Sequence, residues 1–231
     1  MLQKCLIANR GEIAVRIIYA CRELGIQTVA VYSSADENAR YTQLADEAVW
    51  IGEAPPTQSY LNIHTLIQMA QETGCDCVHP GYGFLSESGV FAQAVLDAGL
   101  IWVGPSPSAL QIMGSKIDSR ELMQSVGVPV VPGFQYSTVS DEIWLTEAEK
   151  IGYPIMVKAS AGGGGKGIRV VYAPDDLLEN IQSAKYEAEQ AFGNSHIFLE
   201  HFIEVGRHIE IQVFGDSHGN ILHLFERECS T

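Results

Sequence analysis

Apolar and polar positions alternate in blocks through the first half of the chain. Four short runs are apolar, as strands of a buried sheet are: residues 5–8, 27–32, 77–79 and 101–103. Three longer stretches carry apolar side chains at helical spacing and end near a glycine: residues 12–24, 62–72 and 88–98. This alternation predicts β-α units that build a parallel sheet.

The pattern changes in the second half. Residues 128–133 contain two prolines and a glycine, which stiffen and redirect the chain and so predict a hinge. Helices are predicted at residues 141–150 and 175–191. Strands are predicted at five places beyond the hinge: residues 155–159, 168–171, 197–201, 208–214 and 221–227. Helices mixed with antiparallel strands indicate a small α+β unit, and the fold class of the whole chain is α/β.

The charge balance narrows the class of partner. The 231 residues are 46% hydrophobic and carry a formal net charge of −14, from 28 acidic and 14 basic side chains. Such a surface repels phosphate backbones and anionic lipid, so we expect no nucleic-acid and no membrane partner. No apolar run approaches the roughly 20 residues that span a bilayer, and no signal-peptide core follows Met1. These features favour the cytoplasm or an organelle matrix.

Cysteine usage indicates free thiols. Five cysteines are an odd number in a chain too large to need disulfides, which favours a reducing compartment. Cys75-Asp76-Cys77 has neither the usual zinc nor the usual redox spacing. We therefore expect Cys77 to pack inside a strand, and we assign no metal ligands.

A glycine run between two predicted strands carries the strongest chemical signal. Residues 162–165 are four consecutive glycines, with Lys158 before them and Lys166 and Arg169 after them. Successive glycine N–H groups can approach an anion without hindrance, and lysine adds a point charge, so the loop is expected to cover phosphates. A flexible linker is the alternative, but linkers are seldom flanked by strands and lysines on both sides. The run is not a Walker A loop, because no Gly-Lys-Ser/Thr precedes a helix.

Three loops follow the carboxyl ends of the predicted parallel strands, where ligands of such folds bind: residues 9–12, 79–84 and 104–107. For residues 104–107 we favour a tight turn. His79 stands before Pro80 at a strand end, and we expect it to fix the loop rather than to act as a ligand. Asn9-Arg10-Gly11 has one glycine, so dinucleotide binding in the Rossmann manner is not expected.

Five stretches together resemble the consecutive signatures of the biotin carboxylase family, in the family's order: residues 7–14, 79–87, 153–169, 208–212 and 226–230. The glycine loop is shared with carbamoyl-phosphate synthetases and other ATP-grasp ligases, while the first two stretches point to biotin carboxylases. The resemblance implies a Rossmann-like pre-ATP-grasp domain at residues 1–113 and an ATP-grasp domain at residues 114–231. A lid is expected at about residues 131–203, followed by the start of the ATP-grasp body.

The resemblance also implies a reaction. ATP phosphorylates bicarbonate to carboxyphosphate, with magnesium, and the carboxyl group passes to biotin held on a carrier domain or protein. The implied partners are ATP, bicarbonate, the biotin carboxyl carrier, a carboxyltransferase component and a second copy of the full-length protein. Acetyl-CoA carboxylase, which serves fatty acid biosynthesis, is one such enzyme, but the sequence leaves the final acceptor open.

The family's nucleotide contacts carry over onto nine positions of this chain: Lys116, Lys158, Gly164, Gly165, Glu200, His201, Phe202, Ile203 and His208. The lysines resemble the ATP-contacting lysines, the glycines the phosphate-covering loop, and residues 200–203 the segment that grips adenine and ribose. His208 resembles the histidine near ribose and phosphates. Two positions depart from the family pattern. Position 201 is histidine here but commonly lysine in the family, and position 161 is alanine here but often glycine in the family. Cys229, near the reacting centre in the family, is expected to have a packing role.

The catalytic residues are expected downstream of Thr231. In the family, the magnesium carboxylates and the bicarbonate arginine follow the position of Thr231, so the chain is expected to be an incomplete and inactive fragment. Two alternatives stay open: a carbamoyl-phosphate-synthetase-like ligase, and a nucleotide-binding or assembly module without catalysis.

Overall fold

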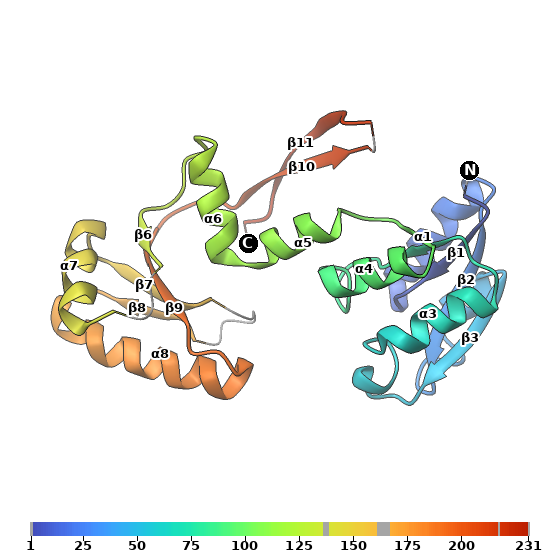
Figure 1. The fold of residues 1–231 in the computed structure, drawn as a ribbon, viewed down its shortest axis with the longest axis horizontal. Coiled ribbons are helices and arrows are strands. Elements are labelled where there is room, and N and C mark those ends of the chain that lie inside the picture. Colours follow the sequence, from blue (N-terminus) through green and yellow to red (C-terminus); the bar gives the residue numbers. More distant parts are fainter. Residues whose placement is uncertain (1, 136–138, 161–166, 217, 231) are drawn as a thin grey trace. The chain divides into compact units, whose positions relative to one another are not determined.

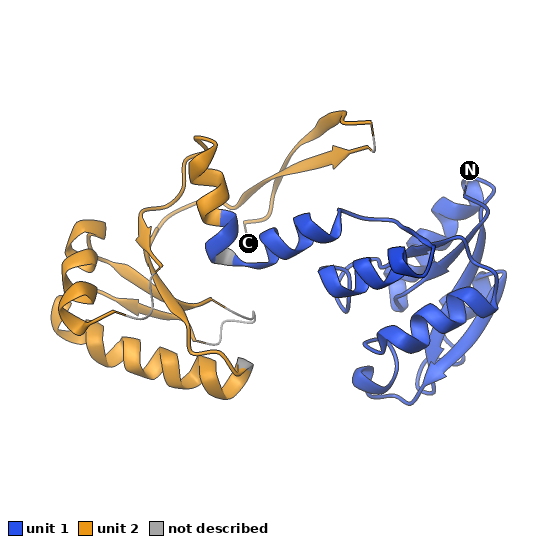
Figure 2. Cartoon of the chain, in the orientation of Figure 1, with its two compact units in different colours: residues 1–119 blue, residues 120–231 orange. Residues whose placement is uncertain are grey.

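The computed structural model describes residues 2–135, 139–160, 167–216 and 218–230. The chain divides into two compact units, Met1–Ser119 and Arg120–Thr231 (Figure 2). Each unit has its own sheet and its own buried core. Within the described residues, no helix is both long and apolar enough to cross a membrane.

Unit 1 is built on a five-stranded parallel sheet in the order β3-β2-β1-β4-β5 (Figure 1). The strands are β1 (Lys4–Ile7), β2 (Gln27–Ser33), β3 (Glu47–Gly52), β4 (Cys77–His79) and β5 (Ile101–Trp102). The helices are α1 (Gly11–Glu23), α2 (Arg40–Leu44), η1 (Pro56–Gln58), α3 (Ile63–Glu72), α4 (Gly89–Asp97) and α5 (Pro107–Gly114). Helix α6 (Lys116–Ser125) crosses the boundary between the units.

Helices cover both faces of this sheet. Alternate strand residues enter two separate cores, one formed with α3 and α4 and the other with α1 and α2. Leu6 belongs to the first core, while Cys5, Ile7 and Cys77 belong to the second. Burial on both faces explains why these strands appear as short apolar runs in the sequence, and it confirms the predicted parallel α/β sheet. Cys77 is fully buried, in line with the packing role expected for it.

Unit 2 contains a four-stranded antiparallel sheet in the order β6-β9-β7-β8. Its strands are β6 (Gly133–Phe134), β7 (Ile155–Ala159), β8 (Arg169–Val171) and β9 (Ile197–His201). Helices α7 (Asp141–Ile151) and α8 (Leu177–Phe192), the latter preceded by η2 (Pro174–Asp176), pack on this sheet around the buried Trp144. A separate hairpin is formed by β10 (Ile209–Gly215) and β11 (Ile221–Glu228).

Several elements escaped the sequence pattern. Strand β3 lies at the sheet edge with half of its residues exposed, so its apolar signal is weak. Helices α2, α5 and α6 were also not predicted. At residues 104–107, where a tight turn was predicted, the chain bends at Gly104 and Pro105. Pro107 then begins α5, and the Ser106 hydroxyl caps this helix by accepting a hydrogen bond from the Ala109 N–H at 3.2 Å.

Candidate nucleotide site

The sheet of unit 2 places Lys158 and Glu200 on the same face. Lys158 is the register partner of Phe198, and Met156 is the partner of Glu200, so the two charged residues are diagonal neighbours across β7 and β9. The alternate residues of β7 are buried in the core with α7 and α8, which leaves Lys158 on the opposite face. Lys158 Nζ lies 2.5 Å from Glu200 Oε2, and the two side chains are 28% and 18% exposed. The predicted cation therefore stands on the strand that leads into the glycine run, paired with a carboxylate.

A second cation, which the sequence did not reveal, contacts the same carboxylate. Arg120 Nη1 lies 2.8 Å from Glu200 Oε1, and Arg120 Nη2 donates a hydrogen bond to the Val131 carbonyl. Arg120 and Glu200 are 80 positions apart in the chain. Nothing in the local pattern around Arg120 distinguishes it from a solvated helix arginine, because the contact exists only after β9 has folded against α6.

The end of β9 is held mostly through its backbone. The His201 N–H donates to the Pro132 carbonyl at 2.8 Å, and the Phe202 N–H donates to the Pro154 carbonyl at 2.8 Å. His201 Nδ1 lies 2.9 Å from the Gly152 carbonyl oxygen. The histidine, at a position where the resemblance leads us to expect lysine, therefore makes a contact within unit 2. Ile203, just past the strand, is 57% exposed.

The other predicted residues have different positions. His208 precedes β10 with its side chain 65% exposed, and its Nε2 lies 3.6 Å from Glu210 Oε1. Lys116 is the first residue of α6, and its side chain lies outside the described part of the structure. Gly164 and Gly165 also lie outside the described residues. The structure thus brings Lys158 together with Glu200 on two paired strands, and the adjoining His201 and Phe202 continue the second of them.

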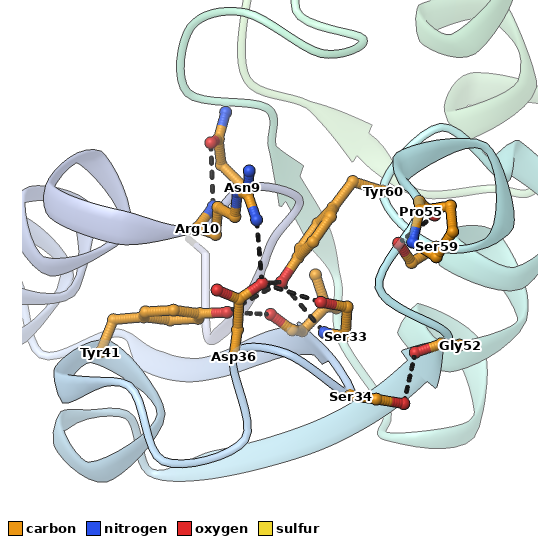
Figure 3. A network of polar contacts seen from close by, with 11 residues as sticks. Asn9, Arg10, Ser33, Ser34, Asp36, Tyr41, Gly52, Pro55, Ser59 and Tyr60 are labelled. Carbon is orange, nitrogen blue, oxygen red and sulfur yellow. Dashed lines mark hydrogen bonds and ion pairs between the residues drawn. The ribbon is translucent and has the colours of Figure 1, made fainter.

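Unit 1 has a polar network at the carboxyl edge of its sheet (Figure 3). The Asp36 carboxylate accepts hydrogen bonds from Tyr60 at 2.7 Å and Ser33 Oγ at 2.8 Å, and it pairs with Arg10 at 3.2 Å. Burial alone would raise the pKa of Asp36, but these three hydrogen bonds outweigh it and hold the pKa below its ordinary value. The Tyr60 hydroxyl also lies 3.0 Å from that of Tyr41. The network joins the ends of β1 and β2 to the segment after η1.

The loop after β4 is fastened to the same edge. The Asn9 side-chain amide donates to the carbonyls of Pro80 and Tyr82, each at 2.7 Å. The Gly81 N–H donates to His79 Nδ1 at 3.1 Å, and burial lowers the pKa of this imidazole. The Phe84 ring stacks on Tyr60 with 4.9 Å between ring centroids. His79 thus fixes the loop by accepting a backbone hydrogen bond, as the sequence predicted.

Known proteins that resemble this chain match it along its whole length. A model described as "Biotin carboxylase, N-terminal domain" matches residues 1–110, and one described as "Carbamoyl-phosphate synthase L chain, ATP binding domain" matches residues 115–231. Biotin carboxylase 1 of Bacillus subtilis is 51% identical over 230 residues, which are 100% of this chain and 51% of that protein. The mitochondrial methylcrotonoyl-CoA carboxylase subunit alpha of Oryza sativa is 49% identical over 99% of this chain and 31% of its own length.

The solved structures that resemble this chain also include biotin carboxylases. A "biotin carboxylase-beta-gamma-ATP complex" from Campylobacter jejuni has a TM-score of 0.94 at 43% identity, over 100% of this chain and 52% of that one. The biotin carboxylase domain dimer of Hydrogenobacter thermophilus 2-oxoglutarate carboxylase, in complex with MgADP, ADP and bicarbonate, has a TM-score of 0.92 at 46% identity. It is covered over 51% of its length, and this chain over 100%.

A parallel α/β unit, followed by an antiparallel sheet whose lysine precedes a glycine run, places the chain in the ATP-grasp class. More narrowly, the chain belongs to the biotin carboxylase family. It spans about half the length of the biotin carboxylases that it matches.

Proposed function

We propose that the chain forms the nucleotide-binding part of a biotin carboxylase, an ATP-dependent ligase that carboxylates biotin with bicarbonate. The observation that carries the proposal is the match to Bacillus subtilis biotin carboxylase 1, at 51% identity over the whole of this chain. The ligands named for the related structures, MgADP, bicarbonate and beta-gamma-ATP, support ATP and bicarbonate as the substrates. A carbamoyl-phosphate-synthetase-like ligase is less well supported, because residues 1–110 match the biotin carboxylase model.

The residues of unit 2 fit a nucleotide. Phosphoryl transfer depends mainly on positioned cations and backbone dipoles around the triphosphate, and Lys158 offers such a cation four residues before the glycine run in the sequence. Residues 200–203 would present strand backbone to the adenine edge, with Lys116, Gly164, Gly165 and His208 as further contacts. Magnesium would compensate the charge of the triphosphate, but the described residues hold no cluster of three or more His, Cys, Asp or Glu side chains that could bind it. We therefore assign no step to the metal.

The further partners follow from the relatives. The dimer of the Hydrogenobacter protein supports association with a second copy, and a biotin carboxyl carrier and a carboxyltransferase component would complete the reaction. The relatives include bacterial and mitochondrial proteins, which supports the cytoplasm or an organelle matrix. The final acceptor could be that of acetyl-CoA carboxylase, in fatty acid biosynthesis, or that of methylcrotonoyl-CoA carboxylase, which appears among the relatives.

The proposal is tested by ATP binding and by turnover. Lys158→Ala should weaken ATP binding to the chain at least tenfold, because a charge-assisted contact of about 1.5–3 kcal/mol is lost. Titration calorimetry measures this effect. Lys150→Ala is the matched control, since Lys150 is 64% exposed and pairs with Glu147 on α7. Equal affinity of the Lys158 variant and the wild type would contradict the role given to this lysine.

Turnover is tested in a chain of the relatives' length. We would join this chain to the remaining half of Bacillus subtilis biotin carboxylase 1 and measure release of ADP that depends on both bicarbonate and free biotin. Turnover should appear in the fusion and fall at least tenfold with Lys158→Ala. A folded fusion that binds ATP but ignores biotin would favour the non-catalytic module, and stimulation by ammonia in place of biotin would favour the carbamoyl-phosphate-synthetase-like ligase.

A further inference from the structure

Arg120 is buried to an unusual degree for its charge. Its side chain is 9% exposed, and it is the only charged residue classed as buried in the described ranges 2–135, 139–160, 167–216 and 218–230. Burying a guanidinium costs free energy unless it is paired with an opposite charge and its N–H groups are hydrogen-bonded. The contacts of Arg120 therefore indicate its role. The partners of Arg120 are Glu200 Oε1, at 2.8 Å, and the Val131 carbonyl.

The surrounding backbone leaves room for this side chain. A Cβ atom added at Gly133 would lie 3.1 Å from Arg120 Nη2 and 2.5 Å from the Leu199 carbonyl oxygen. Gly133 is also the register partner of Glu200 in the β6–β9 pair. The glycine therefore lets the guanidinium reach past β6 to the carboxylate, which makes the contact part of the fold of this strand pair.

Glu200 is shared between two cations. Its Oε1 faces Arg120 and its Oε2 faces Lys158 Nζ at 2.5 Å. A carboxylate held by Lys158 alone would neutralise that ammonium and would repel an approaching phosphate. With Arg120 in place, the charge of Glu200 stays compensated when Lys158 turns toward an anion. The three side chains together carry one net positive charge, which favours an anionic ligand.

We propose that Arg120 is a positioning residue of the nucleotide site, which holds Glu200 in place and compensates its charge so that Lys158 is available to a phosphate group. The proposal rests on the proposed function, because it assumes that Lys158 serves a nucleotide. It assigns Arg120 an effect on phosphate recognition rather than on the nucleoside.

The test compares ATP with adenosine on the 231-residue chain. Arg120→Met keeps the length and apolar stem of the side chain but removes the charge. ATP affinity, measured by calorimetry, should fall at least tenfold, because charge-assisted contacts are involved. Adenosine affinity, measured by ligand-observed NMR, should change less than about threefold, because the nucleoside has no phosphate. Arg120→Lys should restore part of the ATP affinity, since it keeps the charge but not the paired geometry.

A second variant separates charge compensation from folding. In Arg120→Met/Glu200→Gln, the carboxylate that needs compensation is gone, so ATP affinity should exceed that of Arg120→Met alone. Equal losses for ATP and adenosine, or no gain in the double variant, would overturn the proposal and leave Arg120 a purely structural residue. If Arg120→Met does not fold, the same two ligands are compared in Arg120→Lys, where an equal loss for both would likewise overturn the proposal. A folded wild-type chain that binds neither ligand would instead contradict the proposed function.

Discussion

His79 shows how one side chain can take a structural role in a place where ligands bind. Its imidazole lies at the carboxyl end of β4, and its Nδ1 accepts a hydrogen bond from the Gly81 N–H at 3.1 Å. Only the neutral ring can accept that bond at Nδ1. Burial lowers the pKa of His79, which favours the same neutral form. The hydrogen-bond geometry and the lowered pKa therefore favour the same neutral ring.

The pKa of His79 implies a pH dependence of stability. In the unfolded chain the ring takes up a proton below its ordinary pKa of about 6.5, while the native state resists protonation. The unfolded state then binds more protons, so the free energy of unfolding should fall as the pH drops below about 6.5. Urea unfolding of the chain at pH 7.5 and pH 5.5 measures this difference.

His79→Asn is the control for this prediction. The asparagine Oδ1 can accept the Gly81 hydrogen bond but does not titrate. The variant should lose less stability than the wild type between the two pH values. The same loss in both proteins would show that other groups cause the pH dependence.

At the scale of the elements, loops that follow neighbouring strands hold one another in place. The loop after β4 takes its shape from Asn9, which follows β1, through the two hydrogen bonds to Pro80 and Tyr82. Tyr82 also donates a hydrogen bond to Glu12 in the first turn of α1. Parallel strands bring these carboxyl ends to one edge, so segments about 70 residues apart form one preorganised loop cluster.

Two glycines in this loop give a matched pair of substitutions. Gly81 and Gly83 have φ angles of +66° and +68°, so alanine at either site costs about 1–2 kcal/mol of backbone strain. An added Cβ at Gly81 would also lie 2.8 Å from Asn9 Nδ2, whereas at Gly83 nothing lies within 4 Å. Gly81→Ala should therefore lower the free energy of unfolding by a further 1–3 kcal/mol or so, because the buried Asn9 hydrogen bonds are disturbed.

Urea unfolding of both variants, beside the wild type, measures the difference. Gly83→Ala reports the strain alone. If both variants lose the same stability, the contact between Asn9 and the loop does not hold this segment in place.

Charge and exposed apolar surface oppose each other in the molecule as a whole. The net charge of −14 keeps copies of the chain apart. The β10–β11 hairpin, however, exposes apolar side chains on both strands, including the register partners Phe214 and Leu222 at 65% and 63%. An exposed apolar strand pair promotes association.

The salt dependence of association should separate charge repulsion from apolar attraction. Screening at 0.5 M NaCl shortens the range of the charge repulsion, so the chain should associate more at 0.5 M than at 0.05 M in sedimentation experiments. Phe214→Lys with Leu222→Glu removes apolar surface, keeps the net charge and offers a cross-strand ion pair, so it should reduce association.

The control pair is Leu24→Glu with Tyr172→Lys, which also keeps the net charge. These residues are 74% and 64% exposed but lie outside the hairpin. This pair should leave association unchanged. A wild-type chain that stays monomeric at both salt concentrations would contradict the role of the hairpin.

The sequence by itself determined the class of fold and predicted Lys158 as a cation of the candidate site. Strands buried on both faces, such as β1 and β4, must be apolar throughout, and one-sided helices such as α1 must repeat their apolar residues at helical spacing. These local patterns predicted the parallel sheet. Lys158 lies only four residues before the glycine run in the chain, so a phosphate-binding loop could be predicted without knowing the fold.

Only the tertiary structure decided that Arg120 and Lys158 both contact the Glu200 carboxylate. The edge strand β3 and helix α6 gave weak patterns, because an element that is half exposed places few constraints on its sequence. Arg120 meets Glu200 across 80 positions, and Asn9 meets Pro80 across 71. Such contacts depend on strand order and register, which arise when the sheets assemble, and no local spacing of residues encodes them.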